Sequence, residues 1–441
     1  MEKYDKYDLI IVGAGPGGSA CAKIAAEQGL KVVVFERGNY PGEKNTSGSV
    51  IEMEAATEVI PDFPHDDTPL QRSVEGGALW LQSDDGLLGV NGFIQKWSAD
   101  QGEAKAYTVY RNEFDRWWAG KATKAGAKLV TKTLITDVLK EKGKVVGVVT
   151  EKGQKILGNI VIGAEGTNSM VAVRAGFRGP WKPNEVALCV KYDYPLPKAV
   201  IDKLWGGFSE NSCKIELFFG QAMAPAGYLW IFPNRESISV ATGTGLQEML
   251  NRGENLNYYI NAFLKHSILG RALQGVKPRS YIAHEIPYLL TYPSKPLEVC
   301  KDNVMIIGDA AGSVCNFDGE GWDGAVLGGK KAAEVAIEAL GTGDTSKDSF
   351  RKYQKWFNSY VQSDLDWGWR IGHWLFNEAG YERLGGPLMK IFSSIFDHPH
   401  TEHFVPTFNQ NITKLLPLLA TLALLGKLHL KPYADLLGSM V

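Results

Sequence analysis

The feature that most constrains this chain is a glycine-rich turn near its N-terminus, between a strand and a helix. Residues 7–15 (YDLIIVGAG) form an apolar run that predicts a strand buried on both faces, and a helix of small residues is expected through about Gln28. The turn GAGPGG between them satisfies the G-x-G-x-x-G pattern of dinucleotide-binding βαβ units. Gly13 permits the tight turn, Gly15 lets backbone amides approach a pyrophosphate, and Gly18 lets the helix sit close to the sheet. The helix N-terminus then faces the phosphates.

An acidic residue at the expected distance supports the same interpretation. The run KVVVF at 31–35 predicts a second strand, which ends at Glu36, about 20 residues after the glycines. A carboxylate there accepts hydrogen bonds from both ribose hydroxyls and disfavours the 2′-phosphate of NADP. A lone glycine fingerprint is often a chance tight turn, but the strand, the helix and the spaced acid together favour a nucleotide site. They do not separate FAD from NAD.

A second glycine and acid element occurs much later in the chain. A short apolar strand that begins at Val304 leads into GDAAG at 308–312. A carboxylate at a strand end, between residues too small to block a ligand, suits a hydrogen bond to a ribityl hydroxyl of a flavin. The turn from Gly319 to Gly324 opens a helix to about Leu340, whose positive end suits the N1–C2=O edge of a reduced flavin. Either piece alone fits an ordinary turn, but both together indicate a folded-back nucleotide domain that binds FAD.

Composition excludes several function classes. The chain has 47 basic and 49 acidic residues, so it lacks the excess of positive charge that nucleic-acid binding needs. Its five cysteines lie far apart without a C-x-x-C pair, which argues against a zinc or iron–sulfur site held by this chain alone and fits a reducing compartment. The histidine cluster at 398–403 is more typical of a solvated loop than of a metal site, so no metal is expected. We expect neither a secretory signal nor a membrane-spanning helix.

The motifs together resemble a known flavoprotein fold. GAGPGG, Glu36-Arg37, Arg111 at a helix start, GAEGTNS at 163–169 and GDAAG followed by GEG occur in the order and spacing of the p-hydroxybenzoate-hydroxylase fold. Within that fold the chain is similar to the geranylgeranyl-reductase/FixC superfamily. The resemblance implies an α/β protein that binds FAD on a Rossmann-type βαβ fold, with an antiparallel-sheet substrate domain and a helical C-terminal region.

Two stretches resemble different branches of this superfamily. ERGNYPGEKNTSG at 36–48 is similar to a stretch of FixC-like enzymes, which pass electrons from electron-transfer flavoprotein to a membrane quinone. PAGYLWIFP at 225–233 has the P-x-x-Y-x-W-x-F-P pattern of prenyl reductases, which hydrogenate isoprenoid lipids, although those enzymes usually carry Lys-Pro-Cys-Gly where this chain has KNTSG. Quinone reduction is therefore the first hypothesis, geranylgeranyl reduction the alternative, and a flavin-bearing scaffold subunit the second alternative.

The length of the chain suits two or three domains. We expect an FAD-binding domain of residues 1–75, 100–185 and 280–345, a sheet-rich substrate domain of 76–99 and 186–279, and a helical region of 346–441. In that last region, aromatic residues are dense from 350 to 381, and the apolar segment 412–425 has basic flanks. This pattern favours association with one membrane leaflet over burial within a helical cap.

The residues expected to bind FAD lie in these motifs. They are Gly13, Gly15, Pro16, Gly17, Gly18, Glu36, Arg37, Lys44, Arg111, Gly308, Asp309, Gly319, Gly321 and Trp322. Arg111 equally suits an ordinary charge at a helix start. Tyr228, Trp230 and Phe232 share one face of a strand, which suits core packing and a hydrophobic substrate wall equally well. Proton delivery is assigned to Lys44, His284 or water, with no choice among them.

The electron donor is expected to be a protein. Gly243-Thr244-Gly245 lacks a third glycine and a spaced acid, so it predicts a turn and not a second dinucleotide site. The resemblance implies electron-transfer flavoprotein as the partner and a ferredoxin-like iron–sulfur subunit as a further one, since the animal-type enzymes hold a cluster on cysteines that this sequence lacks. The acceptor is a membrane quinone or a prenyl lipid at the membrane surface. The protein is expected to be cytoplasmic and peripheral on the cytoplasmic face of the membrane.

Overall fold

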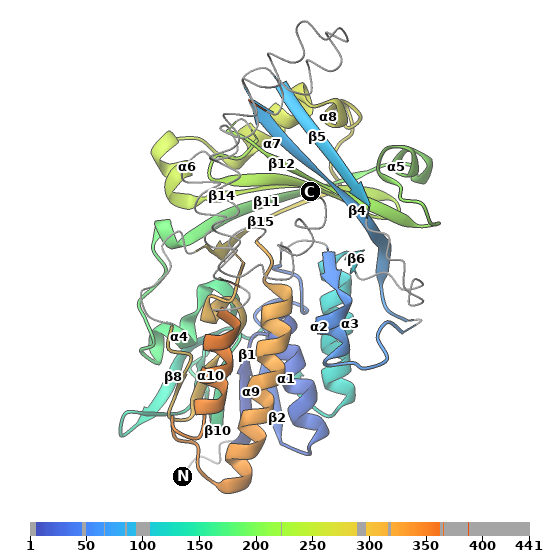
Figure 1. Ribbon diagram of the computed structural model, residues 1–441. Helices are drawn as coiled ribbons and strands as arrows, with labels where there is room; N and C mark the ends of the chain where they lie inside the picture. Colours follow the sequence, from blue (N-terminus) through green and yellow to red (C-terminus); the bar gives the residue numbers. More distant parts are fainter. Residues whose placement is uncertain are drawn as a thin grey trace, which may run out of the picture.

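The computed structural model places two sheets one above the other, with helices on the outer side of each (Figure 1). The lower part in this view is built on a mainly parallel sheet, and the upper part on a mainly antiparallel one. The structure describes residues 6–45, 50–65, 67–83, 86–93, 106–221, 223–288, 297–315 and 319–361, together with 365 and 387. Most of the segment 346–441, including the apolar segment 412–425, lies outside these residues.

The parallel sheet forms because its strands are continuous apolar runs that need cover on both faces. Leu9, Ile10 and Ile11 are fully buried, as are Ile160, Val161 and Ile162 beside them. The path of the sheet runs β16-β17-β10-β1-β2-β7, and β8 and β9 extend it through β10. Its strands are β1 (Lys6–Val12), β2 (Val32–Phe35), β7 (Lys128–Val130), β8 (Ile135–Glu141), β9 (Lys144–Thr150), β10 (Lys155–Gly163), β16 (Cys300–Lys301) and β17 (Val304–Ile306).

Two helices from distant parts of the sequence lie side by side on this sheet: α1 (Pro16–Glu27) and α9 (Trp322–Thr342) (Figure 1). Glycines permit this approach, because a Cβ at Gly329 would lie 2.2 Å from the carbonyl oxygen of Gly17. α10 (Arg351–Tyr360) packs beside α9 and buries Tyr353 and Phe357 in the same core. The other helices of this part are α2 (Met53–Thr57), α3 (Arg111–Lys124) and α4 (Met170–Arg174), with the 3-10 turns η1 (Gly166–Asn168) and η3 (Gly308–Ala311).

The second sheet follows the order β15-β11-β14-β13-β12-β4-β6-β3, with β5 paired to β4. Every pairing is antiparallel except that of β12 with β4. The bounds are β3 (Val50–Glu52), β4 (Leu70–Ser83), β5 (Gly86–Phe93), β6 (Ala106–Val109), β11 (Val186–Pro195), β12 (Ser212–Phe219), β13 (Gly227–Pro233), β14 (Ser237–Gly245) and β15 (Ser280–Pro287). The 3-10 turn η2 (Pro183–Glu185) and the helices α5 (Lys198–Trp205), α6 (Leu246–Arg252), α7 (Leu256–His266) and α8 (Ile268–Arg271) complete this part.

The antiparallel sheet has two faces of different character. Val190, Leu229, Ile231 and Val240 point to the face that α7 covers, where they form an apolar core. Residues of the opposite register point toward the parallel sheet and the nucleotide-binding elements. This second face, which we call the roof, therefore covers the ligand-binding edge of the parallel sheet.

The fold class expected from the sequence is confirmed, with one local error. Gly243–Gly245, expected to form a turn, continues β14, and Gly243 pairs with both Cys189 and Tyr228. The lack of a side chain explains this, since a Cβ at Gly243 would lie 2.8 Å from the Cys189 sulfur. The division of the chain into domains stays a prediction. Among the described residues, no helix has the length and apolarity to cross a membrane.

The contact between α1 and α9 yields a test of stability. Gly329→Ala should lower the thermal midpoint by several degrees, because overpacking at a backbone contact costs about 1–3 kcal/mol. Gly341→Ala, on the exposed end of the same helix with open space around it, should leave the midpoint unchanged or raise it. Thermal unfolding of the three proteins gives the comparison, and equal midpoints for Gly329→Ala and the wild type would contradict the packing described.

Candidate functional site

The site begins at the glycine turn between β1 and α1, where two glycines are required by geometry. Gly13 has φ +103°, and a Cβ on it would lie 2.3 Å from the carbonyl oxygen of Ala164. A Cβ on Gly18 would lie 2.0 Å from the carbonyl oxygen of Gly13. Around Gly15, in contrast, there is no atom within 4 Å of that position. The backbone at Gly15 is therefore open to a ligand, as the sequence predicts for the pyrophosphate.

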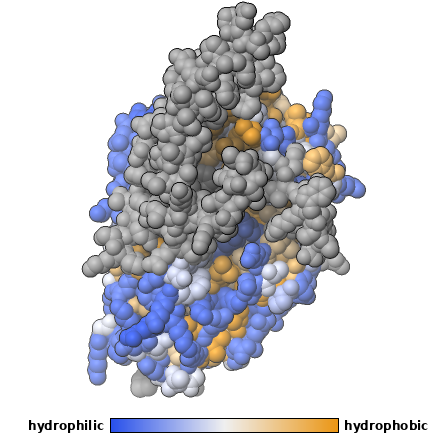
Figure 2. Space-filling view, viewed as in Figure 1, coloured by the Kyte–Doolittle hydropathy of each residue, from blue (hydrophilic) through white to orange (hydrophobic). Residues whose placement is uncertain are grey.

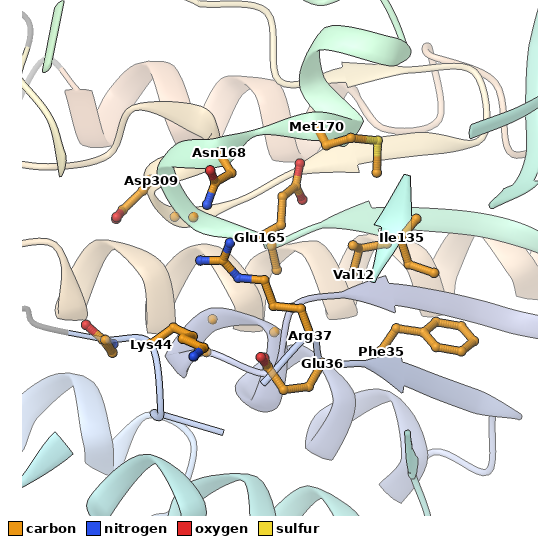
Figure 3. Close-up of a pocket in the computed structure, with 18 of the residues that line it drawn as sticks. Val12, Phe35, Glu36, Arg37, Lys44, Ile135, Glu165, Asn168, Met170 and Asp309 are labelled. Atoms are coloured by element: carbon orange, nitrogen blue, oxygen red, sulfur yellow. The ribbon is translucent and has the colours of Figure 1, made fainter. Parts of the chain in front are cut away.

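The acid at the end of β2 is held beside this turn. Glu36 accepts hydrogen bonds from the backbone N–H of Gly38 (2.6 Å) and of Ala14 (3.1 Å), so its carboxylate lies next to the glycines. The neighbouring Arg37 meets Asn168: with the amide oxygen turned toward it, Asn168 accepts from both guanidinium NH2 groups at 3.2 Å. Figure 3 shows Glu36, Arg37 and Asn168 around one space, together with Lys44, Glu165 and Asp309.

That space is a cavity of about 610 Å³, within the usual range for a cofactor site. Most of the residues predicted to bind FAD line it. They are Gly13, Gly15, Pro16, Gly17, Gly18, Glu36, Arg37, Lys44, Gly308 and Asp309, and His284 lines it as well. The two glycine and acid elements, far apart in the sequence, thus meet at one cavity between β1, η3 and the antiparallel sheet.

Asp309 is a buried acid that accepts only a long hydrogen bond from a side chain among the described residues. Burial raises its pKa to about 6, although Arg111 and a hydrogen bond from Thr167 oppose the shift. The Thr167 hydroxyl lies 3.4 Å from Oδ2 and donates its shorter bond, of 2.7 Å, to the carbonyl oxygen of Glu285. A ribityl hydroxyl would add a donor to this long bond, which fits the predicted role.

Glu165 lines the same cavity, and the sequence analysis did not assign it to the site. Its Oε1 accepts from the backbone N–H of Val171 at 2.7 Å, whereas Oε2 is buried and has no partner among the described residues. Burial raises the pKa of Glu165 to about 7. The sequence could have indicated this residue, because Glu165 follows the carboxyl end of β10, beside the end of β1, where open α/β sheets bind ligands.

The two candidates for proton delivery differ in their surroundings. Burial, Arg37 and Arg111 lower the pKa of His284 to about 4, so its imidazole is neutral at pH 7. Lys44 is more than half exposed and lies 3.7 Å from the carboxylate of Glu43. Both line the cavity, and their catalytic roles stay predictions.

Arg111 lies one residue layer away from the cavity. It forms a buried, two-bond ion pair with Asp115, at 2.7 and 2.9 Å, and Asp115 is the partner that lines the cavity. A direct contact between Arg111 and the dinucleotide stays a prediction. Its charge nevertheless acts on the site, because it favours the ionised form of Asp309 and the neutral form of His284.

The segment predicted for the flavin end lies beside Asp309. A Cβ on Gly321 would lie 3.4 Å from Oδ1 of Asp309, and one on Gly319 would lie 3.4 Å from the hydroxyl of Tyr228. The first amides of α9, which the sequence offered to the flavin, donate to the carboxylate of Glu320: that of Trp322 at 2.8 Å and that of Asp323 at 3.3 Å. Trp322 itself packs against Phe114 and Trp118 in a separate core.

The aromatic stripe of β13 faces the nucleotide-binding elements. Ring centroids of Tyr228 and Trp230 are 5.1 Å apart, and those of Trp230 and Phe232 are 6.2 Å apart. Trp230 and Phe232 are buried with Cys189 and Ala241, and Tyr228 reaches Gly319. The stripe thus contributes to packing and ends beside the predicted flavin position.

Two family models match the chain. The model for FAD dependent oxidoreductases matches residues 8–180, and that for the geranylgeranyl reductase catalytic domain matches residues 202–276. FixC of Rhizobium meliloti strain 1021 is 32% identical over 82% of this chain and 83% of its own. FixC of Escherichia coli strain K12 is 31% identical over 86% of this chain and 89% of its own.

Solved structures share the fold at lower identity. A geranylgeranyl bacteriochlorophyll reductase-like protein from Thermoplasma acidophilum has a TM-score of 0.71 and 23% identity, covering 94% of this chain and 97% of its own. A flavin-dependent brominase has a TM-score of 0.63 and 19% identity, covering 87% and 92%. The cavity fits the cofactor of these flavoproteins, since an open phosphate turn, an acid for the ribose and a buried acid for the ribityl chain lie along it.

Removal of the buried acid tests this fit. Asp309→Ala should weaken FAD binding about 10- to 100-fold, because a hydrogen bond to a charged group contributes about 1.5–3 kcal/mol. The ratio of flavin to protein absorbance after purification, and a titration of the apoprotein with FAD, measure the effect. Asp344→Ala, at an exposed turn, is the control. Unchanged affinity in Asp309→Ala would contradict the assigned role.

Glu165 makes the stability of the apoprotein depend on pH. Because its folded-state pKa is raised from 4.5 to about 7, the folded chain holds a proton that the unfolded chain releases in this window. The contribution of this proton to the free energy of unfolding is therefore complete below pH 4.5 and is lost as the pH rises through 7. Glu165→Gln mimics the protonated form. We therefore expect its free energy of unfolding to exceed that of the wild type by on the order of 1 kcal/mol near neutral pH, and to equal it in acid. Unfolding curves of the two apoproteins across this range would contradict the account if they ran parallel.

Proposed function

The chain belongs to the FixC family of FAD-dependent oxidoreductases, and from this premise we propose that it passes electrons from a protein donor through FAD to a membrane quinone. FAD supplies a two-electron carrier when it is bound. The residues of the cavity hold its two ends: the Gly13–Gly18 turn and Glu36 at the ADP half, and Asp309 at the ribityl chain.

The observation that carries the proposal is that the sequence candidate for a second dinucleotide site has the wrong local structure. Gly243–Gly245, the best sequence candidate, is extended backbone in β14 with strands paired on both sides, so it offers no turn for phosphates. Glu36 also disfavours the 2′-phosphate of NADP at the first site. A docked protein is the simpler electron source, and the FixC relatives support electron-transfer flavoprotein, with a ferredoxin-like iron–sulfur subunit as a further partner.

The acceptor side of the proposal rests on the face of β13. Tyr228 lies beside Gly319, and the buried rings of Trp230 and Phe232 continue the aromatic stripe away from the predicted flavin end. Flat aromatic side chains suit a quinone ring through stacking and through loss of apolar area from water. Since quinones reside in bilayers, we place the protein at the cytoplasmic face of the membrane. The tail proposed to touch lipid lies outside the described residues.

The second candidate function is reduction of a geranylgeranyl lipid. The match of residues 202–276 to the geranylgeranyl reductase catalytic domain favours it, because this range covers β12, β13 and the aromatic stripe. The same apolar surface would hold an isoprenoid chain. The family match to FixC extends over most of the chain and supports the quinone reaction more broadly. A third possibility is a scaffold subunit whose flavin serves other proteins.

One anaerobic experiment separates these functions. With the bound FAD reduced chemically, a soluble menaquinone analogue should restore the visible flavin absorbance and yield the quinol, whereas geranylgeranyl lipids offered in parallel should remain unsaturated. Saturation of the isoprenoid would instead select the second function, and no reoxidation by either would select the scaffold. Rapid bleaching of the oxidised protein by NADH alone would contradict a protein donor.

A further inference from the structure

A second cavity, of about 660 Å³, lies beside the FAD cavity on the roof side. The loop before Asn45, the start of α3, and the lower faces of β11, β14 and β15 enclose it. Its lining carries both signs of charge in equal number. The basic residues are Arg111, Lys191, Arg235 and Arg279, and the acidic ones are Glu43, Glu113, Asp193 and Glu236. Because the charges are balanced, the cavity has no preference for an anionic ligand and is suited to water.

Only one layer of residues separates the two cavities. Gly42 and Asn45 line both of them. The ion pair beside them spans the wall, since Asp115 lines the FAD cavity and Arg111 lines the second one. The amide of Asn45 donates to Oδ2 of Asp115 at 3.1 Å, which makes the wall a continuous set of hydrogen-bonding groups.

Lys191 is the titratable amine of this second cavity. It lies on β11 in the same register as Cys189 and Asp193, so it points toward the nucleotide-binding elements. Its neighbour across the sheet is Ile282, and two residues further along β15, on the same face, His284 lines the FAD cavity. Burial lowers the pKa of Lys191 to about 8, Arg111 adds to this shift, and Asp193 and Asp115 oppose it.

Hydrogen bonds connect this region with the exterior. Asp193 accepts from the hydroxyl of Ser237 at 2.7 Å and forms an ion pair with Arg279. The Arg279 side chain is 45% exposed. Ser237 in turn shares a hydrogen bond of 2.6 Å with the hydroxyl of Tyr110. Polar groups therefore extend from solvent at Arg279 to the acid two residues from Lys191.

We propose that the second cavity is the proton inlet of the FAD site and that Lys191 is its relay. The inference rests on the proposed function, because a protein donor supplies electrons without protons. Two-electron reduction of FAD to its neutral reduced form then consumes two protons from solvent. Each time, Lys191 releases one proton from Nζ toward the Gly42–Asn45 wall and regains one from water in the cavity, so the side chain is unchanged overall.

The relay makes a kinetic prediction that needs neither quinone nor partner protein. Dithionite should bleach the flavin of the wild-type holoprotein more slowly as the pH rises through 8, since neutral Lys191 has no proton to donate. In Lys191→Met and Lys191→Arg, the flavin should bleach about tenfold or more slowly than in the wild type at lower pH. Neither variant should show the decrease in rate as the pH rises through 8. Lys214→Met, which removes a partly buried lysine of β12 bonded to Asn91, is the matched control and should behave as the wild type.

The arginine variant separates a relay from a fixed charge. If Lys191→Arg bleached at the wild-type rate, Lys191 would act through its charge alone, and the proposal would be overturned. Wild-type rates in both variants would overturn it as well. The flavin content of each variant is measured first. If neither variant retains FAD, the wild-type holoprotein is bleached in H2O and in D2O, and we expect the slower rate in D2O. Equal rates in the two solvents would contradict proton-limited reduction.

A second measurement follows the titration of the Lys191 amine directly, in both the holoprotein and the apoprotein. Competitive acetylation at a series of pH values, followed by peptide mass spectrometry, gives the titration of each lysine amine. Lys191 should become reactive near pH 8. Titration together with the ordinary surface lysines, or no reaction at any pH, would contradict a solvent-connected relay. Failure of quinone to reoxidise the flavin would leave both results untouched, so the two proposals fail separately.

Discussion

The structure depends on the contact of backbone with backbone between α1 and α9. A Cβ at Gly17 would lie 2.5 Å from the carbonyl oxygen of Ala325, and one at Gly329 would lie 2.2 Å from that of Gly17, so side chains there would force the helices apart. Because α1 follows the phosphate turn and α9 follows the Asp309 segment, this contact brings the two ends of the cofactor site together. The contact therefore fixes the position of each predicted FAD-binding element relative to the other.

A buried ion pair contributes to the electrostatics around this site, where burial is the largest cause of each pKa shift. Arg111 and Asp115 lie between the two cavities, and the Arg111 charge acts on the pKa values of Asp309, His284 and Lys191. These three groups come from η3, β15 and β11, which are remote from one another in the sequence. The same arginine charge thus affects titratable groups of the FAD cavity and of the second cavity. Arg111 carries a buried charge here, and its contact with the dinucleotide stays a prediction.

The part of the site predicted from the sequence was the part with local causes. The turn at Gly13, the acid at Glu36 and the acid at Asp309 each follow a strand in a fixed local pattern, and all three line one cavity. The position of Lys191 depends on elements that meet only in the folded chain. Lys191 faces the nucleotide-binding elements because β11 lies between β14 and β15. Alternation along a strand predicts a shared face, but not what that face covers.

Two distant glycine and acid elements are proposed to hold the two ends of one FAD. Titration of the apoprotein with FAD and with FMN, followed by flavin fluorescence, tests this arrangement. We expect one FAD per chain and an affinity for FMN at least about 100-fold weaker, because FMN lacks the adenosine half that the glycine turn and Glu36 would bind. No saturable binding of FAD, or equal affinity for FMN, would contradict it.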